Sequence, residues 1–190
     1  MSPPPRTWGW TPSRGKGMKI NVKRMTFCAL LTAIALTIFM VEAQIPLPVA
    51  LPGMKLGLAN VVTVYAMFAL GPADTLMILL ARVFLGSLFA GGSTLIYSLA
   101  GGLLCYVSML FMRKVLTEGQ LWVCGSIGSI FHNVGQVGVA SLFNRTPQLF
   151  VAYLPMLVIP GVIAGALTGL AAQLVLKRLG NQFRFDPNKK

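Results

Sequence analysis

The sequence contains few charged residues, and acidic side chains are especially scarce. Only four of its 190 residues are Asp or Glu and one is His, whereas 55% are hydrophobic and 11% charged, with a mean hydropathy of +0.74. Soluble globular domains carry about 25% charged residues, so this composition excludes an ordinary soluble domain. It predicts an all-α membrane protein that crosses the bilayer several times.

Several kinds of chemistry lack the residues that they need. The cysteines at 28, 105 and 124 have no CxxC spacing and lie in apolar segments, so neither a disulfide framework nor a zinc site is indicated. No GxxxxGK[ST] loop is present for ATP hydrolysis, and no two carboxylates are spaced to hold Mg²⁺ against a diphosphate. We therefore expect no metal, no cofactor and no catalytic residue.

The charge that is present is strongly positive. Sixteen Lys and Arg give a formal net charge of +12, which is also typical of proteins that bind nucleic acid. Here the basic residues stand at the ends of long apolar runs, without interleaved aromatic residues, and this is the pattern of membrane topology. We therefore expect the lipid bilayer, not nucleic acid, to be the partner of this charge.

The apolar runs predict six membrane-spanning helices of about 20 residues each. Residues 1–22 are expected to be a disordered basic segment, residues 23–178 the transmembrane domain and residues 179–190 a basic cytoplasmic tail. Pro155 and Pro160 fall in the last helix, which allows its beginning to be a separate interfacial piece. The predicted helices cover about residues 25–44, 56–70, 73–90, 93–112, 121–143 and 149–176.

The distribution of Lys and Arg predicts the orientation. With six spans, both termini share one side with the loops after the second and fourth helices, and 13 of the 16 basic residues lie there. Lys55 and Arg145 lie on the opposite side, and Arg82 lies within a span. By the positive-inside rule both termini are cytoplasmic, which predicts a multi-pass protein of the bacterial plasma membrane.

The fifth predicted helix has one polar face near the middle of the membrane. Ser129, His132, Asn133 and Gln136 fall within a sector about 100° wide. Facing lipid would leave these groups without hydrogen bonds, so they should point into the bundle. Two interpretations remain open: these side chains bond to neighbouring helices, or they form part of a ligand site.

Arg82 lies close to the middle of the third predicted helix, where an arginine costs about 2.5 to 3.5 kcal/mol on insertion scales. Glu42 and Asp74 are the two acids that could pair with it, and each lies about 12 Å away in depth. Neither is an obvious partner. The guanidinium therefore caps backbone carbonyls, reaches toward Glu42 or receives an anionic ligand.

Further polar residues gather in the outer half of the predicted bundle. Asn60 and Tyr97 lie near the outer ends of the second and fourth helices. A substrate site open to the outside, under the loop from Ile45 to Lys55, is the simplest hypothesis. Its predicted residues are Glu42, Asn60, Arg82, Tyr97, His132, Asn133 and Gln136.

Two patterns of small residues predict close helix packing. Ala29 and Ala33 form such a pair on the first helix, and Gly161, Gly165 and Gly169 repeat every four residues on the last. These stripes let helix backbones approach closely, either within the bundle or against a partner. For the glycines we expect packing within the bundle.

Four blocks occur in a specific order and spacing: KLGLANVVTVYAMFALGP, ARVFLGSLFAGG, YSLAGGLL and FHNVGQ. With them the chain, over about residues 23–178, resembles the integral-membrane family named heptaprenyl diphosphate synthase component I, also called the Gx transporter family. That family is more distantly similar to the S-components of energy-coupling factor transporters, which are six-helix receptors for vitamins and metals. The wider pattern comprises the alanine pair, an IPLP loop and a Gly-Pro turn into the third helix.

The resemblance implies two different functions. A catalytic prenyl diphosphate synthase subunit needs aspartate-rich motifs, which four isolated acids cannot supply, so the family name implies a non-catalytic accessory of polyprenyl diphosphate or quinone synthesis. The likeness to S-components implies a receptor for a small extracytoplasmic solute that works with partner ATPases and a coupling membrane subunit, which Ala29 and Ala33 would contact. Solute capture for uptake is our prediction, and the accessory function is the alternative.

Overall fold

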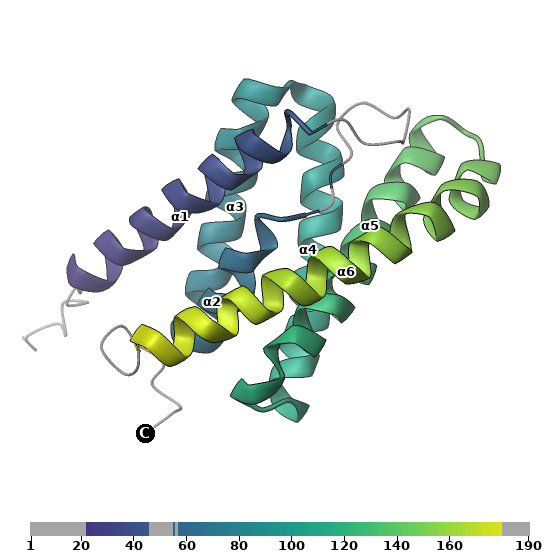
Figure 1. Cartoon of the computed structure of the whole chain (residues 1–190). Coiled ribbons are helices and arrows are strands. Elements are labelled where there is room, and N and C mark those ends of the chain that lie inside the picture. The colour runs from purple at the N-terminus through teal and green to yellow at the C-terminus, as the bar shows by residue number, and fades with distance from the viewer. Residues whose placement is uncertain (1–21, 46–54, 56, 180–190) are drawn as a thin grey trace, which may run out of the picture.

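The computed structural model describes residues 22–45, 55 and 57–179, which form helices and no strands (Figure 1). The predicted six helices are confirmed as helices, and the fifth has the predicted bounds. Predictions for the two termini and for most of the IPLP loop lie outside the described residues. The elements are α1 Val22–Glu42, α2 Asn60–Ala69, α3 Pro72–Ala90, α4 Gly92–Val115, the 3₁₀ helix η1 Glu118–Gln120, α5 Leu121–Phe143 and α6 Gln148–Leu179.

Four of these helices are long and apolar enough to cross a membrane: α1, α3, α4 and α6. Helix α2 is apolar but has ten residues, about half the length of a span. Helix α5 has 23 residues and is not among the four, since its middle carries the polar face described above. The structure thus supports a membrane protein with several spanning helices.

Helix α2 forms the centre of the bundle (Figure 1). Its residues from Val62 to Ala69 are all buried, and it contacts each of the other five α-helices. A helix this short is stabilised by tertiary packing more than by its own length. It begins later than predicted because the chain turns at Gly57, whose φ of +83° is a left-handed conformation that suits glycine.

Helix α6 runs through both of its prolines without a break. The suggestion of a separate interfacial beginning is therefore wrong. Next to Pro160, the hydroxyl of Ser129 donates to the carbonyl of Gly161 at 2.6 Å, and the amide of Asn133 donates to the carbonyl of Leu157 at 2.8 Å. These two bonds attach the turns on either side of Pro160 to α5. The carbonyls that the prolines leave without an intrahelical donor are those of Val151 and Met156.

Helices α5 and α6 approach each other through glycines, and we call this contact the glycine seam: Gly125 on α5 with Gly161, Gly165 and Gly169 on α6. A Cβ at Gly165 would lie 2.5 Å from the carbonyl oxygen of Gly125, and one at Gly169 would lie 2.3 Å from that of Leu121. These distances leave no space for a side chain. The prediction that the α6 glycines pack within the bundle is confirmed.

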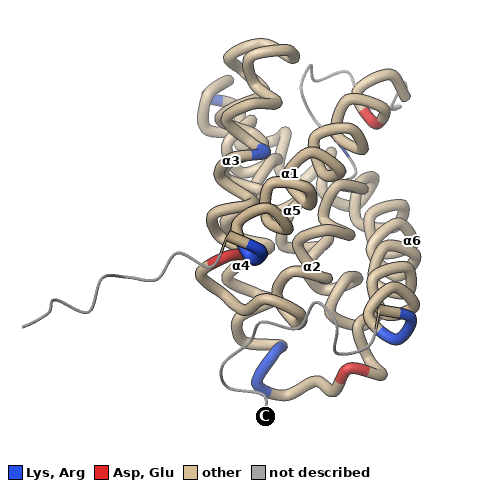
Figure 2. Tube along the Cα trace, turned by 90° about the vertical axis from the view of Figure 1, so that its left-hand side faces the viewer, with Lys and Arg blue, Asp and Glu red and all other residues tan. Residues whose placement is uncertain are grey.

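The charged residues of the described chain lie mainly toward helix ends, and most of the tube in Figure 2 is uncharged. Arg24 near the start of α1 pairs with Asp74 in the first turn of α3 at 2.5 Å. The last turns of α4 and α6 carry further basic residues. Phe27 of α1 and Leu179 of α6 line one groove, so α1 begins and α6 ends at the same end of the bundle.

Candidate functional site

Six buried polar side chains converge between α1, α2, α3 and α5. None of them is more than 6% exposed. The sequence predicted five of them as site residues, and the structure brings these five together with a sixth from the segment before α2. We call this group the polar cluster, and its members are Glu42, Lys55, Asn60, Arg82, His132 and Gln136.

Glu42, at the end of α1, is bound to the backbone that leads into α2. One carboxylate oxygen accepts the N–H of Gly57 at 2.5 Å, and the other accepts the N–H of Leu58 at 3.0 Å. Hydrogen bonds of this kind to an ionised acceptor are stronger than neutral ones. Glu42 therefore fixes the entry to α2 and keeps both of its oxygens occupied.

Arg82 of α3 has hydrogen-bond donors that are not used within the described chain. One of its terminal nitrogens donates to Oδ1 of Asn60 at a long 3.4 Å, while its Nε and the Nδ2 of Asn60 have no hydrogen-bond partner among the described residues. Neither acid considered for it forms an ion pair with Arg82 within the described chain, and Asp74 pairs with Arg24 instead. Buried donors without partners are rare in proteins, and each calls for an explanation.

Lys55 is the member that sequence reasoning missed. Its Nζ donates to the carbonyl of Phe39 at 3.3 Å and lies 3.0 Å from the centroid of the Phe39 ring, a cation–π contact. Burial lowers the pKa of Lys55 to about 8, although the nearby Glu42 raises it. Its position in the sequence could have identified it, because Lys55 is the only charged residue between the first two predicted helices and lies just before Gly57.

His132 and Gln136, one turn apart on α5, hold each other and the segment before α2. The backbone N–H of Lys55 donates to Oε1 of Gln136 at 3.3 Å, and Nε2 of Gln136 lies 2.9 Å from Nε2 of His132. Since the amide nitrogen can only donate, Nε2 of a neutral His132 is the acceptor and Nδ1 carries the proton. This pair positions the cluster and contributes no charge.

The space inside the cluster is small, with a volume of about 10 Å³. That is about the volume that a single water molecule needs. The two backbone N–H groups bound to Glu42 and the two cations near it favour its ionised form. With Glu42 negative and with Lys55 and Arg82 positive, the charges around the space leave one positive charge uncompensated. Its lining comprises Phe39, Glu42, Lys55, Gly57, Arg82, Ser98, His132 and Gln136.

Two predicted site residues lie apart from this space. Asn133 turns toward α6, where its amide bonds to Leu157, although its Oδ1 has no partner among the described residues. Tyr97 packs against a separate group formed by Val137, Ala140 and Leu157. Their assignment to a substrate site stays a prediction, and the structure places neither beside the Arg82 guanidinium.

Ala29 and Ala33 are exposed on α1. They do not contribute to helix packing inside the bundle in the way that the α6 glycines do. In a membrane this stripe is available to lipid or to another protein.

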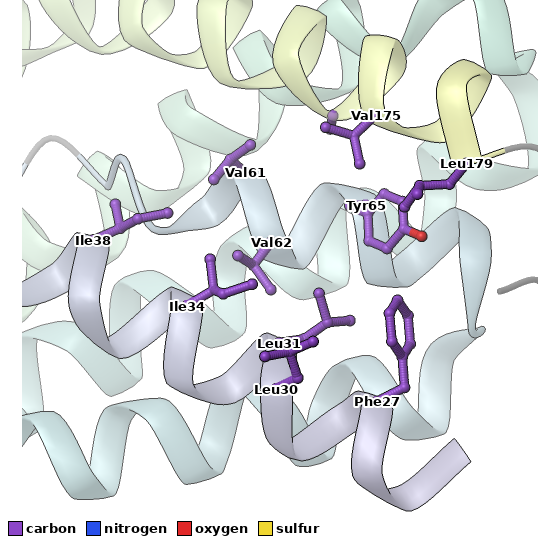
Figure 3. A pocket seen from close by; sticks show the side chains of 11 residues that line it. Phe27, Leu30, Leu31, Ile34, Ile38, Val61, Val62, Tyr65, Val175 and Leu179 are labelled. Carbon is purple, nitrogen blue, oxygen red and sulfur yellow. The ribbon is translucent and has the colours of Figure 1, made fainter. Parts of the chain in front are cut away.

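An apolar groove of about 450 Å³ lies between α1, α2 and α6 (Figure 3). Its volume is within the usual range for small-molecule sites, about 300 to 1,000 Å³. Figure 3 shows Phe27, Tyr65 and Leu179 gathered at one end of it, the end where α1 begins. Its walls include Leu31, Ile34, Val62 and Val175.

Comparison with protein families identifies this chain. The family model described as heptaprenyl diphosphate synthase component I matches residues 31–175. The match covers more than half of the chain, which therefore belongs to this family. The comparisons with curated proteins and with solved structures gave no match.

Proposed function

We propose that the chain is a membrane-embedded receptor that holds a small anionic solute at the polar cluster for uptake. The observation that carries this proposal is the one positive charge in excess among Glu42, Lys55 and Arg82, together with the unpartnered donors on Arg82 and Asn60. A buried charge costs free energy unless it is paired. An anionic group bound there would supply the missing charge and the missing acceptors.

The uptake role rests on topology and on the sequence resemblance to S-components. Six helices, cytoplasmic termini and a polar cluster toward the outer half would present the site to a solute arriving from outside. The chain has no ATP-binding loop of its own, so energy would come from partner ATPases through a coupling membrane subunit. The exposed pair Ala29 and Ala33 is our proposed contact with that subunit.

Identification of a co-purifying small molecule tests the receptor function. The chain is purified from membranes in detergent, and its extract is compared by mass spectrometry with that of Arg82→Gln prepared in parallel. We expect a water-soluble anion in the wild-type extract that is missing from the variant. Identical extracts would contradict the proposal.

Replacement of the alanine pair tests the partner. Ala29→Phe with Ala33→Phe should abolish co-purification of other membrane and ATPase subunits and leave the extracted anion unchanged. Val22→Phe with Met25→Phe, also at exposed positions of α1, is the matched control. An unchanged set of partners in the alanine variant would refute this contact.

A second function, as a non-catalytic accessory in polyprenyl diphosphate synthesis, is favoured by the apolar groove. Its walls suit an isoprenoid chain, and Lys177 and Arg178 stand next to Val175 and Leu179 of the groove, where they could meet a diphosphate. Native mass spectrometry with geranylgeranyl diphosphate tests this function. Val175→Trp should block binding and Leu174→Trp, an exposed neighbour outside the groove, should not.

A further inference from the structure

We infer that the polar cluster selects a monovalent anion, such as a carboxylate group, and that Glu42 sets this charge preference. The inference rests on the proposed receptor function and specifies the substrate class of that same site. Three observations carry it: the charges around the space, the hydrogen-bonding groups of the polar cluster, and the size of the space.

The charges favour a single negative charge. Lys55 and Arg82 are positive, Glu42 is negative, and the remaining members of the cluster are neutral. One monovalent anion brings the buried site to neutrality. A divalent anion would leave one negative charge in excess, and an uncompensated buried charge is expensive.

The hydrogen-bonding groups favour an anion over a cation. Three atoms of the cluster have no partner among the described residues: Nε of Arg82, Nδ1 of His132 and Nδ2 of Asn60. All three are donors when Nδ1 of His132 carries the proton, and Arg82 and His132 line the space. The acceptors are already in use, because the Glu42 oxygens hold two backbone N–H groups and Oε1 of Gln136 holds a third. A neutral solute could accept from these donors, but it would leave the excess positive charge in place.

The size of the space favours a compact group. About 10 Å³ is free, which fits one water-sized atom. Lys55 is the lining residue that can move most easily, because it has a flexible four-carbon stem. Its ammonium contacts one residue of the described chain, Phe39, through a long hydrogen bond to the carbonyl and the cation–π contact with the ring. When Lys55 leaves Phe39 and turns to the anion, the site gains both a donor and the room for a carboxylate.

Thermal unfolding of the full chain in detergent tests the charge preference. The probes are acetate, its neutral isostere acetamide, and divalent sulfate, each titrated into wild type and Arg82→Gln. Each probe shifts the unfolding temperature of both proteins through general salt effects, so only the part of the shift that is lost in Arg82→Gln reports binding at the site. We call this part the Arg82-dependent shift. We expect it with acetate and not with acetamide or sulfate.

Two variants test the role of Glu42 and Lys55. Glu42→Gln keeps an acceptor for the α2 entry and raises the charge excess from one to two, so the Arg82-dependent shift should appear with sulfate. Lys55→Gln removes the excess and should weaken acetate binding roughly 10- to 100-fold, the effect of losing one hydrogen bond to a charged group. Thr37→Ala, at an exposed position of α1, is the control and should resemble wild type.

The outcomes distinguish failure of the monovalent inference from failure of the proposed receptor function. An Arg82-dependent shift of wild type with sulfate or acetamide equal to that with acetate overturns the monovalent inference and leaves an Arg82 site standing. No Arg82-dependent shift with any probe overturns both this inference and the proposed function. If Glu42→Gln fails to fold, the Lys55→Gln result decides, and acetate binding equal to wild type overturns the inference.

Discussion

The polar cluster and the glycine seam share one helix, α5, and they use their polar groups in opposite ways. At the seam, Ser129 and Asn133 donate to carbonyls of α6 where the backbones touch. At the cluster, Arg82 and Asn60 are buried with donors left unpartnered. The seam uses its donors for contact between helices, and the atom left unpartnered there among the described residues is an acceptor, Oδ1 of Asn133. The cluster, in contrast, keeps donors that no helix uses.

The boundary between these regions runs between two adjacent residues. His132 lies with Gln136 in the cluster, and Asn133 lies against α6. About 100° separates consecutive residues on a helix, which is enough for neighbours in the sequence to face different helices. A polar face can therefore be part structural and part ligand site, and substitutions on α5 should separate the two.

The largest effect should come from filling the seam. Gly165→Val would place Cβ 2.5 Å from the Gly125 carbonyl oxygen, so the helices must separate, at a cost of about 3 kcal/mol or more. Reversible unfolding in mixed micelles measures the loss. Gly138→Ala on α5, where a Cβ meets nothing within 4 Å, is the control and should be neutral or stabilising. Equal effects of the two would mean that the seam does not hold α5 to α6.

Removal of Gln136 should disturb the cluster and spare the seam. Gln136→Leu leaves the N–H of Lys55 and Nε2 of His132 without their partner, with an expected loss of about 1 to 3 kcal/mol. Acetate binding should weaken as well, because Lys55 loses its support. Unfolding and acetate titration of the same preparation provide both readouts. A variant as stable as wild type would show that this pair does not position the cluster.

The cluster should also respond to pH, through Lys55. Its pKa falls from about 10.5 to about 8 on folding, so the charged form is disfavoured in the folded protein. The stability of the empty protein should rise from about pH 8 to 10.5, as the ammonium is lost. Acetate affinity should fall over the same range, by no more than about tenfold per pH unit for one linked proton. The other charged groups facing Lys55 are Glu42 and Arg82, and His132 is the remaining titratable one.

A Lys55→Arg variant provides the comparison for this pH dependence. Arginine stays charged throughout the range, so its acetate affinity should not change between pH 8 and 10.5. The same decline in both proteins would assign the titration to another group.

The smallest effect should come from Asn133. Asn133→Ala removes the bond to the Leu157 carbonyl, and such bonds in membranes contribute about 0.6 kcal/mol on average. Acetate binding should not change, because Asn133 faces α6. A loss of binding with unchanged stability would place Asn133 in the ligand site, as the polar-face pattern alone allowed.

Local sequence pattern was sufficient to predict the helices and most residues of the polar cluster. The apolar runs predicted the helices, and five of the six cluster members came from polar residues predicted in the middle and the outer half of the bundle. Continuity of α6 through Pro155 and Pro160 was not predicted, because a proline inside a helix usually kinks or breaks it and the local sequence does not show the packing of α6 against α5. Lys55 was missed for the same kind of reason, because its contact with Phe39 joins residues 16 apart in the sequence. His132 and Asn133 have different roles because different helices pack against the two sides of α5, and a single helix's sequence does not show which helix lies on which side.

Anion binding at the polar cluster is the central claim. Bromide is monovalent and compact, and its anomalous scattering locates it directly in crystals of the unmodified chain grown with sodium bromide. We predict an anomalous peak in the space of the polar cluster, within hydrogen-bonding distance of Arg82 and Lys55. Bromide peaks elsewhere on the protein, with none between these two groups, would contradict it.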